Sequence, residues 1–300
     1  MSTLVSNHFD GSPVETVIPG RERDLGGFSV RRVLPSARKR MVGPFIFLDE
    51  MGPAEFVTGQ GIDVRPHPHI GLSTLTYLFD GSMMHRDSTG IELEIRPGDV
   101  NWMTAGSGVV HSERSSLEAR AGTQNLFGLQ AWVALPADKE EVAASFAHHG
   151  KGELPVIAGE GKQIRVVAGS LFGMTSPLAV SSPLIYADVL LDAGAVLPID
   201  PLHPERAVHV LTGAVEVDGE RYGPHGLMLL REGMPVTLRA LEPSRLVVIG
   251  GEPLEGPRHI WWNFVSSSKE RIEQAKEDWR NQRFGKVVND AVEFIPLPEA

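Results

Sequence analysis

Short segments in which apolar and polar positions alternate recur along the chain, and turn residues separate them. Alternation with a period of two is typical of half-buried β-strands. In the first half, the pattern predicts strands at residues 28–34, 43–50, 72–79, 83–87, 91–95, 100–103 and 126–135. It returns at residues 164–167, 184–191, 207–211, 214–217, 226–230 and 246–249. We therefore expect an all-β fold with two groups of strands.

The composition changes over residues 137–155, where Lys, Glu and Ala interrupt the alternating pattern. We interpret this segment as a linker with one helical turn at residues 140–146. It divides the chain into an N-terminal domain, residues 1–136, and a C-terminal domain, residues 156–300. Within the first domain, residues 1–26 are polar and are expected to be loosely held.

One helix is predicted near the end of the chain. The sequence Ser-Ser-Lys-Glu at residues 267–270 is a capping box, which starts a helix over about residues 268–283. Ile272, Ala275 and Trp279 recur at helical spacing and form a stripe that should pack on a barrel. The upstream pair, Trp261 and Trp262, is expected in the core.

Charge and composition exclude several classes of function. The net charge of −10 argues against direct binding to nucleic acid or an anionic membrane surface. The chain has no cysteine, so metal ligands must be nitrogen or oxygen donors. We see no signal peptide and no apolar stretch long enough to span a membrane, so we expect a cytoplasmic protein.

Two pairs of potential metal ligands stand out because each pair is spaced two residues apart. His67 and His69 form the first pair, and His111 and Glu113 form the second. Residues two apart on a strand point to the same face, so the four side chains converge if the two strands meet. Three imidazoles and one carboxylate would then bind one divalent metal ion. A closed structural zinc site is the alternative to an open site that admits substrate.

Other polar residues near these pairs have simpler interpretations. Asp49 and Glu50 are expected to be solvated loop residues, and the His148–His149 pair is expected to be solvated because no third ligand accompanies it. His85 either supports the metal site or is an ordinary exposed histidine, and the sequence leaves this open.

The ligand region resembles a known family. Gly61 followed by His67-Pro-His69 is similar to the first cupin motif, and Gly98-Asp99 followed by Gly108 and His111 is similar to the second. Within the cupins, the residue pattern of these motifs most resembles that of one family, the pirins. The matching positions are His67, His69, Gly71, Tyr77, Leu78, Gly81–Met83, His85, Asp87, Gly98, Asp99, Trp102–Gly106, His111 and Glu113. The close match covers residues 43–135 and a looser one continues to about residue 284.

This resemblance implies two tandem cupin-type, jelly-roll β-barrels followed by the short C-terminal helix. It implies one metal per chain, with Fe(II) favoured, although Mn, Ni, Co, Cu and Zn also suit such ligands. It further implies a quercetin 2,3-dioxygenase-type enzyme that cleaves a flavonol-like aromatic substrate with O₂ and releases CO, with Glu113 as the catalytic proton acceptor. Ser73 departs from the glutamate that many cupins, pirins among them, carry at this position; in pirins that glutamate is not a ligand, because the carboxylate at the position of Glu113 takes the role.

A second function of another class is also implied by the resemblance. Some pirins are non-enzymatic, iron-binding regulatory partners of a transcription factor or a metabolic enzyme, and the negative charge of the chain would suit a basic partner. The same four ligands serve both functions, so the motifs do not separate them.

An internal repeat indicates that the second barrel lacks the metal site. Residues 77–81 align with residues 209–213, an offset of 132 (209 − 77). This offset places Ile199 at the position of His67, Pro201 at His69, Pro243 at His111 and Arg245 at Glu113. We therefore expect the C-terminal domain to keep the barrel frame without metal ligands.

Overall fold

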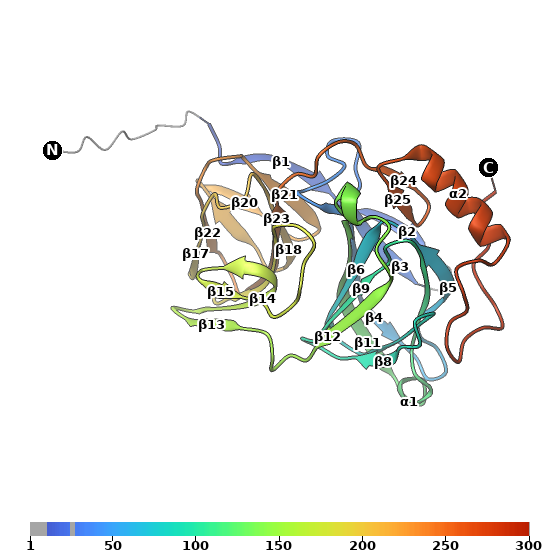
Figure 1. Ribbon diagram of the computed structural model, residues 1–300. Helices are drawn as coiled ribbons and strands as arrows, with labels where there is room; N and C mark the ends of the chain where they lie inside the picture. Colours follow the sequence, from blue (N-terminus) through green and yellow to red (C-terminus); the bar gives the residue numbers. More distant parts are fainter. Residues whose placement is uncertain (1–10, 25–27, 300) are drawn as a thin grey trace.

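The computed structural model describes residues 11–24 and 28–299, and β-strands make up most of it. The strands form two barrels side by side, each made of one large and one four-stranded sheet (Figure 1). The prediction of an all-β fold with two tandem barrels and a short C-terminal helix is confirmed.

The first barrel contains both predicted ligand pairs. Its seven-stranded sheet runs in the order β12 (Ser145–His149), β9 (Val100–Thr104), β6 (Leu72–Asp80), β11 (Gln124–Ala134), β4 (Phe45–Phe56), β3 (Ser29–Leu34) and β2 (Arg21–Asp24). Its four-stranded sheet runs β5 (Asp63–His69), β10 (Val109–Arg114), β7 (Met83–Asp87) and β8 (Glu92–Ile95). Helix α1 (Leu117–Arg120) and a 3₁₀ turn (Ala137–Lys139) complete it.

The second barrel repeats this plan. Its large sheet runs β1 (Val14–Pro19), β21 (Gly226–Leu230), β18 (Glu205–Thr212), β23 (Ser244–Gly251), β16 (Leu184–Leu191), β14 (Lys162–Leu171) and β13 (Val156–Gly159), and β15 (Met174–Thr175) pairs with β14. Its small sheet runs β17 (Val196–Ile199), β22 (Val236–Ala240), β19 (Val215–Val217) and β20 (Glu220–Tyr222).

The two large sheets pack against each other through one continuous apolar core. Leu48, Leu75 and Tyr77 of the first barrel lie in the same buried cluster as Tyr186 and Val247 of the second. Side chains alternate along each strand, so the residues between these core positions point the other way, into their own barrel. The large sheet of the first barrel is therefore covered on both faces.

The chain crosses between the barrels more often than the sequence suggested. The segment interpreted as a linker has no helical turn at residues 140–146; instead it contains β12, which pairs with β9 of the first barrel. There, Nδ1 of His148 lies 2.8 Å from Oδ1 of Asn101, so His148 is not simply solvated. Polar residues near the N-terminus were expected to be loosely held, yet β1 pairs with β21 of the second barrel. Both segments form strands because they pair with strands that lie far away in the sequence.

The C-terminal part of the chain returns to the first barrel. Helix α2 (Lys269–Arg280) and the hairpin of β24 (His259–Trp261) and β25 (Phe264–Ser266) lie over it (Figure 1). Ser268 caps the helix by accepting a hydrogen bond from the Arg271 amide at 3.2 Å. As predicted, Ile272, Ala275 and Trp279 are buried, and they pack with Ile70 and Val110 of the first barrel.

A buried ionic cluster lies between the two large sheets. Glu50 was expected to be solvated, but it is fully buried and accepts from His209 at 3.0 Å and from Arg31 at 3.0 Å. His225 lies 3.1 Å from the same carboxylate. Burial alone would raise the pKa of Glu50, but the hydrogen bond from His209 and the charges of His209, His225 and Arg31 hold the pKa below its usual value.

We expect Glu50→Gln to lower the free energy of unfolding by about 3 kcal/mol at pH 7, because it removes the charged acceptor shared by the buried His209 and the partly buried Arg31. A carboxylate whose pKa is lowered on folding stabilises the fold when the pH lies above the pKa of the unfolded state, near 4.5. This contribution is lost as the pH falls through the lower pKa of the folded state. The difference between the variant and the wild type should therefore shrink below pH 4.5. Urea denaturation measures it, with the exposed Glu55→Gln as the control. Equal stability of both variants would contradict the assignment.

Candidate metal centre

The two ligand pairs lie on neighbouring strands. β5 and β10 are antiparallel, with His67 opposite His111 and His69 opposite Val109. A register shift between His111 and Glu113 marks a bulge, which re-aims the side chain that follows. The alternation of β5 sends His67 and His69 to the same side, as the spacing predicted.

The three histidines converge. One ring nitrogen of each of His67, His69 and His111 lies within 4.8 Å of the others, and all three side chains are buried. Nε2 of His69 is 3.1 Å from Nε2 of His111. Two ring nitrogens this close share either a proton or a cation, so this arrangement fits a metal ion.

Backbone carbonyls set the tautomers of two of these rings. Nδ1 of His67 donates to the carbonyl oxygen of Arg65 at 2.9 Å, and Nδ1 of His69 donates to that of Asn263 at 3.0 Å. With the proton on Nδ1, Nε2 of each ring keeps its lone pair for a metal. Such carbonyl partners are usual for metal-binding histidines.

His85 supports the third ring. Its Nδ1 is 3.5 Å from Nδ1 of His111, and its Nε2 donates to Asp87 at 3.0 Å. The Asp87 carboxylate also accepts from the amide and hydroxyl of Thr89 at 2.8 and 2.7 Å. His85 is buried and stacks on Phe146 of β12. The interpretation as an exposed histidine is therefore wrong, and His85 lies behind His111.

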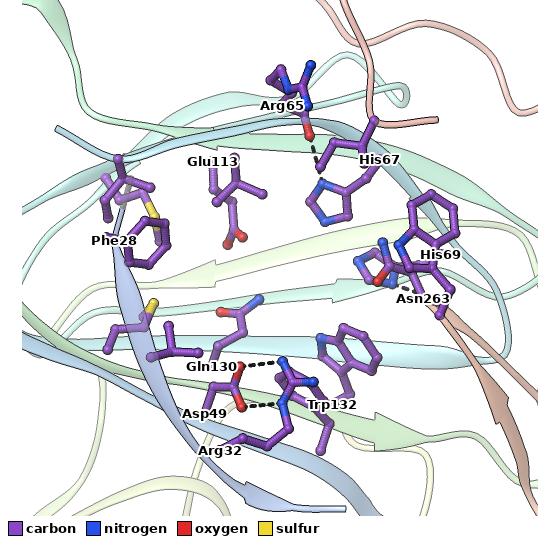
Figure 2. Close-up of a pocket in the computed structure, with 18 of the residues that line it drawn as sticks. Phe28, Arg32, Asp49, Arg65, His67, His69, Glu113, Gln130, Trp132 and Asn263 are labelled. Atoms are coloured by element: carbon purple, nitrogen blue, oxygen red, sulfur yellow. Dashed lines mark hydrogen bonds and ion pairs between the residues drawn. The ribbon is translucent and has the colours of Figure 1, made fainter. Parts of the chain in front are cut away.

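Glu113 lies beside the histidines rather than among them. Its carboxylate is buried, points into the cavity (Figure 2), and accepts from the Thr76 hydroxyl at 3.2 Å. The group of three converging ligands does not include it. Ser73, the departure from the common cupin pattern, lies elsewhere: its hydroxyl is 2.9 Å from that of Thr104, and it does not line the cavity.

Burial governs the protonation of these groups. It lowers the pKa of His67 to about 4, and it lowers the pKa values of His69 and His111 well below their usual value. The imidazoles are therefore neutral at pH 7, as metal ligands must be. Burial also raises the pKa of Glu113, against the opposing effects of His85, Thr76 and Gln130.

The histidines open onto a cavity of about 480 Å³. His67, His69 and Glu113 line one part of it, and the Arg32–Asp49 ion pair lies across from them (Figure 2). The size is in the range of small-molecule sites, and aromatic and aliphatic side chains form most of the remaining wall. A closed structural metal site would have no such opening.

Sequence reasoning missed several cavity residues. Asp49 was expected to be solvated, but it is 3% exposed and forms an ion pair with Arg32 inside the cavity. The alternation of residues 45–50 within a strand was a signal for this placement. Trp262, expected in the core, lines the cavity with Asn263 and Ile295, and no local pattern indicated that the end of the chain would return here.

The second barrel has apolar residues at the corresponding place. β17 corresponds to β5, and its partner is β22, so the simple offset that assigned Pro243 to His111 is wrong. Ile199 pairs with Val236 and Leu197 with Leu238, and all four are buried. Among residues 11–24 and 28–299, one group of three converging ligands is found, in the first barrel. That the second barrel binds no metal stays a prediction.

Comparison with known proteins places the chain. Residues 27–133 match the family model Pirin, and residues 186–285 match the Pirin C-terminal cupin domain. A pirin-like protein of Caulobacter vibrioides is 51% identical over 290 residues, covering 95% of this chain and all of that protein. The chain belongs to the pirin family.

Solved structures agree with this assignment. The crystal structure of a quercetin 2,3-dioxygenase from Acinetobacter baumannii superimposes with a TM-score of 0.88 at 35% identity, covering 95% of both chains. A bacterial pirin from Escherichia coli, in complex with nickel(II), shares the fold with a TM-score of 0.64 at 16% identity, covering 80% of this chain and 99% of that one. Among the described residues of this pirin, no helix has the length and apolar character that crossing a membrane requires.

We expect the wild type to bind one divalent metal per chain, and His67→Ala and His111→Ala to retain almost none after dialysis. Each change removes one of three converging nitrogens, and the second barrel should offer no replacement. Elemental analysis of the full-length variants measures this, with His148→Ala as the control. Full metal content in both variants would disprove the site.

The site should hold its metal at pH 6 and lose it only as the pH approaches about 4, where His67 takes up a proton. Protons compete with metal for the same nitrogen, and a lowered pKa moves that competition to lower pH. Metal content after dialysis at stepped pH values tests this. Loss centred near pH 6.5, the usual pKa of histidine, would show that burial does not protect the ligands.

Proposed function

We propose that this pirin is a metal-dependent dioxygenase of the quercetin 2,3-dioxygenase type, which cleaves a flavonol-like substrate with O₂ and releases CO. The observation that carries the proposal is the convergence of three histidine ring nitrogens beside a cavity of about 480 Å³, which His67, His69 and the Glu113 carboxylate line. The likeness to the A. baumannii quercetin 2,3-dioxygenase supports it.

His67, His69 and His111 would hold the metal, with Glu113 close enough along β10 to join them after a side-chain movement. The nitrogen and oxygen donors suit Fe(II), which we propose as the natural metal, and also Mn, Co, Ni, Cu or Zn. The nickel complex of the E. coli pirin supports a divalent ion of this group. When bound, the ion supplies a Lewis acid that binds the deprotonated flavonol and brings O₂ to it.

Glu113 is the group suited to accept the proton of the flavonol hydroxyl. Three neutral imidazoles would be occupied as ligands, whereas the Glu113 carboxylate points into the cavity and takes no part in the three-histidine group. The Thr76 hydroxyl lies 3.2 Å from Oε1 of Glu113 and 2.8 Å from Oε1 of Gln130, and these neighbours orient the carboxylate. Burial raises the pKa of Glu113 toward the range of an effective base.

The cavity walls orient the substrate and exclude water. Trp132 and Phe47 stack with ring centroids 4.0 Å apart and form a flat surface beside His69. Trp262 and Ile295, from the C-terminal part of the chain, also line the cavity. A planar aromatic ligand enclosed in this way would have its hydroxyl near Glu113 and little water around it.

The regulatory alternative uses the same ligands without turnover. The net charge of −10 would suit a basic protein partner. It becomes the better explanation if the iron-loaded protein releases no CO from any flavonol.

We expect iron-loaded Glu113→Gln to turn over a flavonol at least about 100-fold more slowly than the wild type, because the amide cannot accept the proton. If Glu113 served only to hold the metal, excess iron would restore the rate. Flavonol loss and CO release, measured together with iron content, separate the two roles. The exposed Glu118→Gln is the matched control. Near wild-type turnover of a fully loaded Glu113→Gln enzyme would defeat the assignment as a base.

A further inference from the structure

We propose that Arg32 and Asp49 form a distal recognition site that binds a neutral phenolic hydroxyl on the far ring of the substrate. The site would select polyhydroxylated aromatics over unsubstituted or carboxylate-bearing ones. This inference deepens the proposed function, on which it rests, because it assigns the substrate class of the same cavity.

The ion pair is held rigidly by three neighbouring strands. Arg32 on β3 pairs in register with Asp49 on β4, and Asp49 pairs with Gln130 on β11. Nε and Nη2 of Arg32 donate to Oδ1 and Oδ2 of Asp49, each at 2.8 Å. Figure 2 shows this pair across the cavity from Glu113 and His67. A ligand that touches both ends must therefore span the cavity.

The Asp49 carboxylate keeps acceptor positions for a ligand. Each oxygen has about two lone pairs, and Arg32 uses one on each. Asp49 is 3% exposed and lines the cavity, so its remaining acceptor positions are reached from the cavity and not from the outer surface. Burial raises the pKa of Asp49, whereas the hydrogen bonds and the charge of Arg32 lower it. A hydroxyl from a ligand would donate to one of these acceptor positions.

A flat wall connects the two ends of the cavity. His69 meets Trp132 edge to face at 5.1 Å, and Trp132 stacks on Phe47 at 4.0 Å with an interplanar angle of 12°. The Arg32 guanidinium lies over the Phe47 ring, 4.3 Å from its centroid. This wall suits a planar aromatic ligand with one end at the metal centre and the other at Asp49.

Charge defines which substituent this end accepts. Arg32 and Asp49 neutralise each other, so the pair offers no net positive charge to an anionic ligand. A ligand carboxylate would face the Asp49 carboxylate, and like charges at this distance repel. A phenolic hydroxyl donates its proton to Asp49 at no such cost, and a hydrogen bond to a charged group is among the stronger kinds.

The test compares ligands that share the metal-binding hydroxyl, so that the contribution of the metal cancels. 3-Hydroxyflavone carries that hydroxyl alone, whereas quercetin carries further ring hydroxyls. Quenching of the five tryptophans reports binding without turnover. We expect the wild type to bind quercetin at least about tenfold more tightly, and Asp49→Asn to reduce that preference to about threefold or less. Glu55→Gln, an exposed change on the same strand, should keep the wild-type ratio.

For a third ligand we expect the affinity of the Asp49→Asn variant to increase, which misfolding of the variant could not cause. 3-Hydroxyflavone with a carboxylate on its phenyl ring should bind the wild type more weakly than 3-hydroxyflavone. In Asp49→Asn, where Arg32 keeps its charge, its affinity should rise by at least about fivefold.

The proposal is overturned if the wild type does not prefer quercetin, if Asp49→Asn keeps the preference, or if the carboxylate ligand gains nothing. Selective binding without CO release would leave the recognition site in place and reject the dioxygenase. CO release without selective binding would support the dioxygenase activity and reject the recognition site.

Discussion

The alternation of side chains along the large sheet of the first barrel is the constraint on which the rest of the molecule depends. Both faces of this sheet are covered, so neighbouring residues on one strand serve different environments. On β4, Glu50 points to the second barrel and binds His209, whereas Asp49 points into the cavity and binds Arg32. Because the period of a strand is two, a shift of one residue would exchange the ionic cluster and the cavity wall.

The second half of the chain completes the metal centre of the first half. The carbonyl of Asn263 accepts from Nδ1 of His69, and the amide of Ile295 donates to the carbonyl of Pro66 at 2.8 Å, beside the ligand His67. The segments that follow the second barrel thus complete the site in the first barrel.

Burial gives the cavity its chemical character. Neutral imidazoles present lone pairs to a metal, and two carboxylates lie at separate places in the same enclosure, Glu113 beside the histidines and Asp49 at the far wall. The supports differ accordingly: the neutral side chains of Thr76 and Gln130 contact Glu113, whereas Arg32 holds Asp49 with two charged hydrogen bonds. Burial raises the pKa of both carboxylates, and these neighbours oppose the rise.

The sequence by itself determined the local features. Strand periods, the start of the C-terminal helix and the two i, i+2 ligand pairs all depend on residues close together in the chain, and the resemblance to pirins followed from the same stretches. The cap itself is Ser268, one residue after Ser267, with which the predicted capping box begins. Only the tertiary structure decided which residues meet across long separations. It paired β12 and β1 with distant strands, buried Asp49 and Glu50, placed His85 behind His111, and brought Trp262 and Ile295 to the cavity. Burial and long-range pairing belong to the packed sheets as a whole, so no short window of sequence contains them.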